Sequence, residues 1–212
     1  YLPVIGASLV TSLVLARALA WRRLPTIVAA IFYFGFQALQ ARTHALHYSD
    51  DLAFWRAART QVPGSAKAHL NYAVMVGARG RLDERLEAGQ RAIDIAPEWA
   101  MAHVYQGDTL CRLRGERGWD GATMARHAWP HYKAGFVLNP NDVNLVALAL
   151  QCLYDQKGLE PLRSELLALS DAHPTSWLDY LARDTLEHGD ENRGVDPKYR
   201  PRGYNEGPKD RK

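Results

Sequence analysis

The chain has 212 residues, a mean hydropathy of −0.30, and 26 lysines and arginines against 23 aspartates and glutamates. A net charge of +3 is too small to indicate nucleic-acid binding, and no basic run alternates with aromatic residues, so we expect no nucleic-acid partner. The average hides two unlike ends: residues 1–41 carry almost no charge, and residues 188–212 carry almost no aliphatic side chain.

Residues 1–41 predict two transmembrane helices. The stretch 1–21 is apolar, and at about 1.5 Å per residue it is long enough to cross a hydrocarbon core of about 30 Å. A second apolar stretch, 26–39, follows a short turn at Arg22 and Arg23. The alternative for the first stretch is a secretory signal peptide, which starts with Met and a basic region and ends at a small-residue cleavage site. The start of this sequence has neither feature, which favours membrane helices.

The basic residues predict an orientation. Arg17, Arg22 and Arg23 cluster at the connecting turn, and positively charged loops stay on the cytoplasmic side of a membrane. We therefore expect the turn in the cytoplasm and the rest of the chain on the periplasmic or lumenal side, the membrane being the inner one in a bacterium. Lipid and neighbouring transmembrane helices are expected partners, because both stretches contain small residues that allow close helix contacts: Gly6, Ala7, Ser8 and Gly35.

Prolines recur through the next part of the chain at spacings of 34, 43 and 34 residues: Pro63, Pro97, Pro140 and Pro174. A 34-residue period with a terminal proline is the tetratricopeptide repeat (TPR) signature. Small residues share that period at the two positions where paired helices approach closely, namely Ala73 and Gly107, then Ala58, Ala92 and Gly135. The alternative is an unrelated helical bundle whose prolines are spaced by chance.

We therefore predict an all-α fold in which the transmembrane helices precede a TPR-type α-solenoid. Residues 42–64 form a junction and a half-repeat helix from Asp50 to Gln61, which Ser49 or Asp50 can cap. Residues 65–187 form about three repeats plus a capping helix. Residues 188–212 are expected to be disordered unless a partner orders them, because their composition buries too little apolar area.

Turn signals refine this prediction. Gly80 is placed in the turn of the first repeat, with Asp83 near the start of the following helix. The turn-rich segment 115–123 accommodates the longer middle spacing. It carries Trp119, which is either a contact site or, as we favour, folded back onto its own repeat. Pro130 predicts that the next helix starts near Trp129 or kinks there.

The capping helix is predicted from Ser176 to about Glu187. An uncapped end of a repeat stack would expose apolar surface, so a final helix with one polar face is expected. Trp177, Leu178 and Leu181 are expected to pack inward. The acidic and basic residues are expected to face water: Asp179, Arg183, Asp184 and Glu187.

Candidate reactive residues are few. Cys111 and Cys152 lack the CxxC spacing of a metal or redox site, and a disulfide is conceivable in an oxidising compartment, but two small buried apolar residues are the favoured interpretation. Two histidine pairs, His44 with His47 and His127 with His131, can each share a helical face, yet neither has a third ligand to complete a metal site. No nucleotide-binding or hydrolase motif occurs, so we expect no catalytic residue, metal or cofactor.

A binding groove is predicted on the first helix of each repeat, whose outward positions line the concave wall of a TPR stack. These positions hold Lys67, Leu70 and Val74, then Met101, Val104, Asp108 and Arg112, then Asn144, Gln151, Tyr154 and Asp155. The mixture suits an extended peptide or a protein subunit, although a solvated groove without a dedicated ligand is the alternative. Asp108→Arg with Arg112→Glu is expected to abolish partner retention without unfolding the repeats.

Three features carry a resemblance to a known family. The opening Tyr1-Leu2-Pro3 element of a membrane helix, the junction at 47–55 and the repeat prolines resemble the C-terminal part of transmembrane and TPR glycosyltransferases, which include protein O-mannosyltransferases of the GT-C fold. The resemblance implies repeats on the lumenal side. That family's catalytic carboxylates lie in an early lumenal loop that this sequence lacks, so catalysis is carried over to no residue here.

Two functions follow from these observations. The first is a membrane-anchored TPR protein that mediates protein–protein interaction as a scaffold or accessory subunit, without catalysis of its own. The alternative is the C-terminal module of a GT-C type protein glycosyltransferase, presenting acceptor protein near the membrane. The start without Met looks like the tail of a longer polytopic protein or a processed product.

Overall fold

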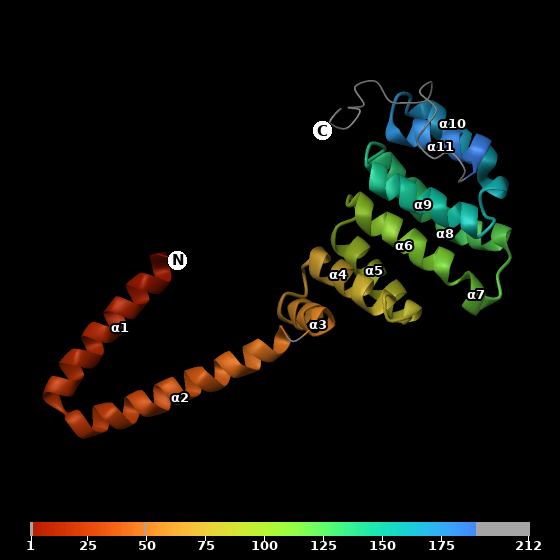
Figure 1. Cartoon of the computed structure of the whole chain (residues 1–212). Helices are drawn as coiled ribbons and strands as arrows, with labels where there is room; N and C mark the ends of the chain where they lie inside the picture. Colours follow the sequence, from red (N-terminus) through yellow and green to blue (C-terminus); the bar gives the residue numbers. More distant parts are fainter. Residues whose placement is uncertain (1, 49, 190–212) are drawn as a thin grey trace, which may run out of the picture. The chain divides into compact units, whose positions relative to one another are not determined.

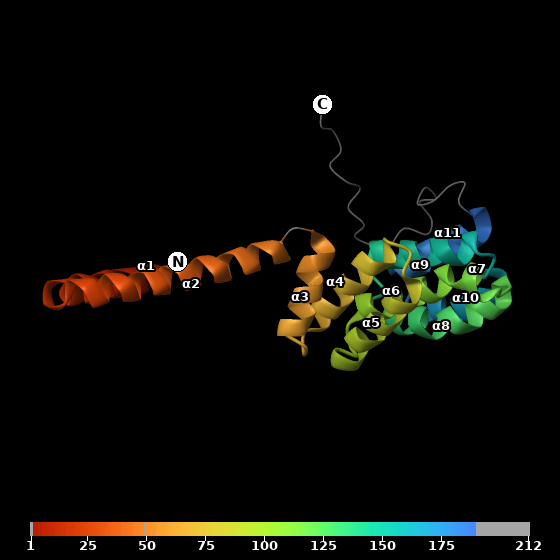
Figure 2. The same cartoon turned by 90° about the horizontal axis from the view of Figure 1, so that it is seen from below.

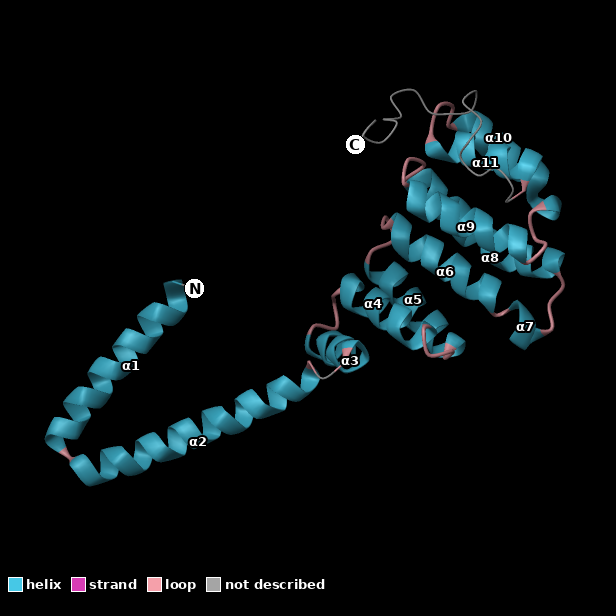
Figure 3. Ribbon diagram, viewed as in Figure 1, coloured by secondary structure: helices cyan, strands magenta, loops and turns pink. Residues whose placement is uncertain are grey.

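The computed structural model describes residues 2–48 and 50–189, apart from the side chains of residues 2–7, 44 and 47. Every regular element in the described residues is a helix, which confirms the predicted all-α class (Figure 3). The chain divides into two compact units, Tyr1–Phe54 and Trp55–Lys212. The predicted disordered tail beyond Gly189 lies outside the described residues.

The first unit contains two apolar helices, α1 (Leu2–Trp21) and α2 (Arg23–His47). They are joined at Arg22, where Thr26 Oγ1 donates hydrogen bonds to the carbonyls of Arg22 (2.7 Å) and Ala18 (3.2 Å). The helix restarts before Pro25, because the first turn of a helix leaves its N–H groups without intrahelical partners and tolerates proline.

Only α2 is a membrane-span candidate among the described residues. Its segment Arg23–Thr43 is long and apolar enough to cross a membrane, and none of it is buried in the structure. The apolar segment Ser8–Trp21 of α1 is shorter. Of the two predicted transmembrane segments, the structure thus supports the second by length and composition, and α2 extends beyond the predicted boundary at residue 41.

The helix predicted after the junction is present as α3 (Asp51–Gln61). Its cap is Asp50, whose Oδ1 accepts a hydrogen bond from the backbone N–H of Ala53 at 2.9 Å. A carboxylate at this position satisfies a donor that the first helical turn leaves unpaired, and its charge suits the positive end of the helix dipole.

The second unit stacks helices in two layers (Figures 1 and 2). One layer, which we call the outer layer, contains α4 (Ala66–Gly77), α6 (Ala100–Arg112), α9 (Val143–Asp155) and α11 (Trp177–His188). The other layer, which we call the inner layer, contains α5 (Leu82–Ile95), α8 (Gly121–Leu138) and α10 (Arg163–Ala172). Two short connectors complete the unit, α7 (Arg114–Arg117) and the 3₁₀ helix η1 (Glu160–Leu162).

The small residues predicted at close helix contacts lie there between α6 and α8. A Cβ on Gly107 would stand 2.7 Å from the Tyr132 ring, and one on Gly135 would stand 2.5 Å from Val104. Neither position has space for a larger side chain. The turn between α4 and α5 contains Gly80 at φ +76°, a left-handed conformation that glycine adopts without steric cost.

The segment after α6 contradicts one of the two alternatives predicted for Pro130, a helix that starts near Trp129, while a kink there stays a prediction. Helix α8 begins at Gly121, with Asp120 Oδ1 accepting the Thr123 N–H at 2.7 Å, and it runs through Pro130 instead of starting near Trp129. Pro130 is exposed, so the backbone groups that its ring leaves unpaired face solvent. Trp119 stacks on His127 with ring centroids 4.4 Å apart, which confirms that it folds back onto its own helix pair.

Helix α11 closes the stack as predicted, but its charged residues are less exposed than expected, since Asp179 and Arg183 are half-buried. Leu178 and Leu181 are buried and Trp177 packs against the same core. Asp184, expected in water, is fully buried. The reason is that α11 contacts both α9 and α10, so two of its faces are covered. The Asp184 carboxylate faces His188 Nδ1 at 3.4 Å.

A disulfide joins Cys111 of α6 to Cys152 of α9, with the two Cα atoms 6.4 Å apart. The favoured interpretation of two separate buried thiols is therefore wrong. The two cysteines occur late in successive outer-layer helices that pack side by side, and this arrangement brings their side chains together.

Removing the disulfide should destabilise the second unit by about 2–4 kcal/mol, because the bond closes a loop of 41 residues and limits the unfolded chain. Urea unfolding of the Cys111→Ala/Cys152→Ala variant, followed by tryptophan fluorescence, measures this change. Dithiothreitol should lower the midpoint of the native chain and leave that of the variant unchanged. If dithiothreitol shifted the urea midpoints of both chains equally, the disulfide between Cys111 and Cys152 would be contradicted.

Candidate binding surface

The predicted groove residues divide into three groups by burial. Five are exposed on the outer layer: Lys67, Arg112, Asn144, Tyr154 and Asp155. Three are half-buried: Val74, Met101 and Gln151. The remaining three are buried between helices and cannot line an open groove: Leu70, Val104 and Asp108. Leu70 packs in a cluster with Ala92 and Ile93 of α5, Val104 lies against Gly135 of α8, and Asp108 pairs with Arg85 of α5.

Asp108 forms a buried ion-paired cluster. Its Oδ2 accepts from Arg85 of α5 at 2.6 Å and from Arg112 of its own helix at 2.8 Å. The Arg85 side chain is only 9% exposed, and it fits because Gly77 has no side chain: a Cβ there would stand 2.4 Å from Arg85 Cδ. The expected Asp108→Arg and Arg112→Glu exchange is therefore wrong as a test of binding, since it would place a second cation beside buried Arg85.

The exposed end of this cluster is Arg112, whose side chain is 55% exposed. Because its guanidinium is held by Asp108, it is presented to solvent in a defined orientation. Asp155 lies at the corresponding end of α9 and accepts from Gln151 Nε2 at 2.6 Å and 2.7 Å. We call the outer-layer residues Arg112, Asn144, Gln151, Tyr154 and Asp155 the polar strip.

The disulfide fixes the two helices that carry the polar strip. Cys111 directly precedes Arg112, and Cys152 directly follows Gln151. The covalent bond therefore joins α6 and α9 at the level where their exposed polar groups lie. This arrangement can offer hydrogen-bond donors, acceptors and both signs of charge to an extended chain, with the partly exposed Tyr154 as an aromatic contact.

The second unit also has two hollows. The first, of about 760 Å³, runs beside α5 and includes Arg91, Asp94, Gln106 and His131 in its wall. The second, of about 920 Å³, lies where α9 and α11 end and includes Tyr154 and Asp155 of the polar strip. We call the second one the terminal hollow. Both were missed from the sequence, because their walls come from helices that are distant along the chain.

The histidines do not form a metal centre among the described residues. His127 stacks on Trp119, and His131 lies beside His103 with ring centroids 6.3 Å apart. Burial, and secondarily the neighbouring His103, lowers the pKa of His131, which favours a neutral imidazole. The side chains of the other predicted pair, His44 and His47, lie outside the described residues.

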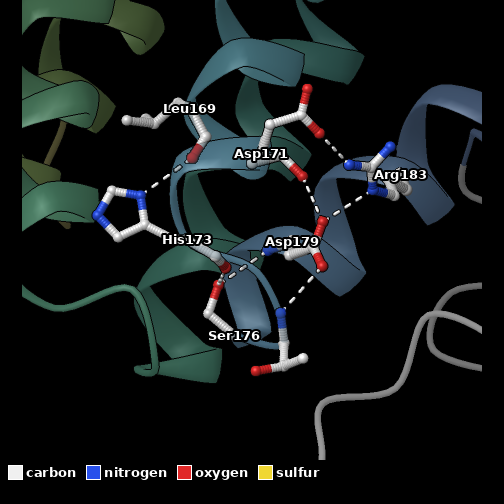
Figure 4. Close-up of polar contacts among 8 residues, drawn as sticks. Leu169, Asp171, His173, Ser176, Asp179 and Arg183 are labelled. Carbon is white, nitrogen blue, oxygen red and sulfur yellow. Dashed lines mark hydrogen bonds and ion pairs between the residues drawn. The ribbon is translucent and has the colours of Figure 1, made fainter.

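A polar network holds α11 against α10 (Figure 4). Asp179 Oδ1 accepts from Ser170 Oγ at 2.7 Å and from Arg183 Nε at 2.8 Å, and its Oδ2 accepts from the Thr175 N–H at 3.1 Å. Arg183 also pairs with Asp171. Burial alone would raise the pKa of Asp179, but these hydrogen bonds outweigh it and lower the pKa. The network fixes the helix that forms one wall of the terminal hollow.

A scan against protein-family models and a search of curated proteins both found no match for this chain.

Asp108→Ala should destabilise the second unit by about 3–5 kcal/mol, because it leaves the Arg85 guanidinium buried without its partner. The matched control is Arg112→Gln, which removes the exposed member of the cluster and should cost less than about 1 kcal/mol. Urea unfolding of each full-length variant gives both values. Similar decreases in the free energy of unfolding for the two variants would contradict the role of Asp108 as the buried partner of Arg85.

Asp179 should make the stability of the second unit sensitive to acid. Since its pKa is lowered in the folded chain, its contribution is complete above the ordinary carboxyl pKa of 3.8 and is lost as the pH falls below that value. Asp179→Asn should therefore lower the urea midpoint at neutral pH and reduce its dependence on pH in the acid range. The control is Asp94→Asn, an exposed position on α5. If the urea midpoints of the native and Asp179→Asn chains fell in parallel with decreasing pH, the proposed contribution of Asp179 to acid sensitivity would be refuted.

Proposed function

We propose that this chain is a membrane-anchored, TPR-type helical-repeat protein that binds a protein partner and performs no catalysis of its own. The observation that carries the proposal is the polar strip: exposed hydrogen-bonding and charged groups on two outer-layer helices that a disulfide ties together. An extended peptide or a protein subunit has backbone and side-chain groups that complement this mixture.

The pairing of the helices supports a repeat architecture. Helices α4 and α5 form one packed pair and α6 and α8 form the next, while α11 packs against both α9 and α10 at the end of the stack. A further correspondence lies 34 residues apart: His69 Nε2 lies 3.0 Å from the Pro63 carbonyl oxygen, and His103 Nε2 lies 2.8 Å from that of Pro97. The same local contact at the predicted period favours repeats over a bundle with chance proline spacing.

Different observations support the membrane anchor and the side of the membrane on which the second unit lies. Helix α2 has the length and composition of a membrane span, and the arginines near the α1–α2 turn favour a cytoplasmic turn. The disulfide between Cys111 and Cys152 favours an oxidising compartment, since such bonds form and persist outside the reducing cytosol. Together these observations support a scaffold or accessory subunit with its repeats in the periplasm or a lumen, in contact with lipid and neighbouring transmembrane helices.

The alternative is the C-terminal module of a GT-C type protein glycosyltransferase. Its support is the resemblance at the Tyr1-Leu2-Pro3 element and the order of an apolar helix hairpin followed by helix pairs. In that case the polar strip would present acceptor protein. Mass spectrometry of the intact protein from native membranes, with its co-purifying subunits, discriminates the two: a longer polytopic chain favours the transferase module, and stoichiometric separate subunits favour the scaffold.

Adding positive charge to the polar strip should release the partner without unfolding the chain. The variant Gln151→Lys/Asp155→Lys changes two accessible residues of α9, so we expect a normal urea midpoint and at least a tenfold loss of the partner that co-purifies with the native chain in mild detergent. Tenfold corresponds to about 1.4 kcal/mol, a modest effect for an interface contact. The readout is quantitative mass spectrometry of that same partner.

The matched control for this experiment is Lys133→Glu, a charge reversal at an exposed position of α8 in the inner layer. It should retain the partner at the native level. Retention by the strip variant, or equal loss from both variants, would remove the polar strip as the binding surface.

A further inference from the structure

The terminal hollow has the chemistry of a site for a basic, aromatic-contacting peptide. Three carboxylates, those of Asp155, Glu160 and Glu187, are in its wall, against the single ammonium group of Lys157. Glu160 accepts from Arg163 at 3.0 Å, yet its side chain remains 74% exposed and accessible to a second cation. Even with Arg163 counted beside Lys157, the three carboxylates outnumber these two cations, which favours a positively charged occupant.

Tyr154 adds an aromatic contact to these charges. It is 37% exposed at the end of α9 and belongs to the wall of the hollow. A guanidinium or ammonium group over an exposed tyrosine ring gains about 0.5–1 kcal/mol. Arginine suits such a site well, because its planar group can stack on the ring and donate to a carboxylate at the same time.

The described chain ends at this hollow. Gly189 adopts φ +63°, and a Cβ there would stand 2.8 Å from the Tyr154 hydroxyl, so the backbone lies close to the hydroxyl end of that side chain. Its N–H donates to the Thr185 carbonyl at 2.9 Å, which fixes the exit of the chain from α11. Gly189, the last residue that the structure describes, therefore belongs to the wall of the hollow.

The sequence that follows contains a basic segment, Lys198-Tyr199-Arg200-Pro201-Arg202, with three cations and no acidic residue. Lys198 lies nine positions after Gly189 in the sequence, and a linker of that length has an end-to-end distance of about 15–20 Å, which is within reach of the hollow. A short tether of this kind gives an effective concentration on the order of millimolar, so even a weak site is occupied.

We propose that the segment 198–202 binds in the terminal hollow of the same chain, with its cations against Asp155 and Glu160 and one of them over the Tyr154 ring. Because Tyr154 and Asp155 also belong to the polar strip, the bound tail would compete with a partner there. That regulatory consequence rests on the proposed function, whereas occupation of the hollow by the tail does not.

A peptide-binding experiment on the full-length chain in mild detergent tests the inference without any partner. The probe is a fluorescently labelled synthetic peptide of residues 195–205, and the readout is its anisotropy. Lys198→Gln/Arg200→Gln/Arg202→Gln neutralises the tethered segment and should leave the hollow open. We expect this variant to bind the peptide at least tenfold more tightly than the native chain, and binding to weaken with added salt.

Two further variants in the tail-neutralised background locate the site. Glu160→Lys, at an exposed position of the hollow, should abolish peptide binding, and Asp94→Lys, an exposed charge reversal on α5, should leave it unchanged. Equal affinity of the native and tail-neutralised chains, or binding that survives Glu160→Lys, would overturn the proposal. Self-association of the native chain that disappears on tail neutralisation would also overturn it, since the tail would then occupy a second copy.

Discussion

The ion pair between Asp108 and Arg85 is the interaction on which the arrangement of the second unit depends. It connects α6 to α5, and therefore one helix pair to the next, in an environment from which water is excluded. A buried carboxylate and guanidinium are each costly to desolvate, so this contact requires both partners in place. Gly77 provides the space for Arg85, and Arg112 extends the same charge cluster to the surface.

Helix α6 is consequently held on two sides by different chemistry. Toward α5 it is fixed by an ion pair, and toward α9 by the bond between Cys111 and Cys152. The polar strip lies on helices that these contacts already hold in place. Its side chains would therefore lose little further conformational entropy when a ligand binds them, which reduces the entropic cost of association. A surface with scattered polar residues can in this way become a preorganised one.

Local sequence signals predicted the helices and their closest contacts well. A packed helix pair follows each of Pro63 and Pro97, namely α4 with α5 and α6 with α8, and the absence of a side chain at Gly107 and Gly135 marked the contact of α6 with α8. The site was predicted less well. Asp108 was assigned to the groove by its repeat position, and Asp184 was assigned to water by its charge. Asp108 is buried against Arg85 of α5, and Asp184 is buried because α9 and α10 both cover α11, contacts that only the packed helices establish. The terminal hollow has no local signal, because its walls meet only in three dimensions.

The closed loop between Cys111 and Cys152 has a mechanical consequence. A pull between the N-terminal apolar helices and a ligand held near α11 would pass along the backbone as far as Cys111, cross the sulfur bridge and continue from Cys152. Helices α7 and α8 lie within the bypassed loop and would carry no tension. Under load, the middle of the stack would therefore keep its folded length while its ends yielded first.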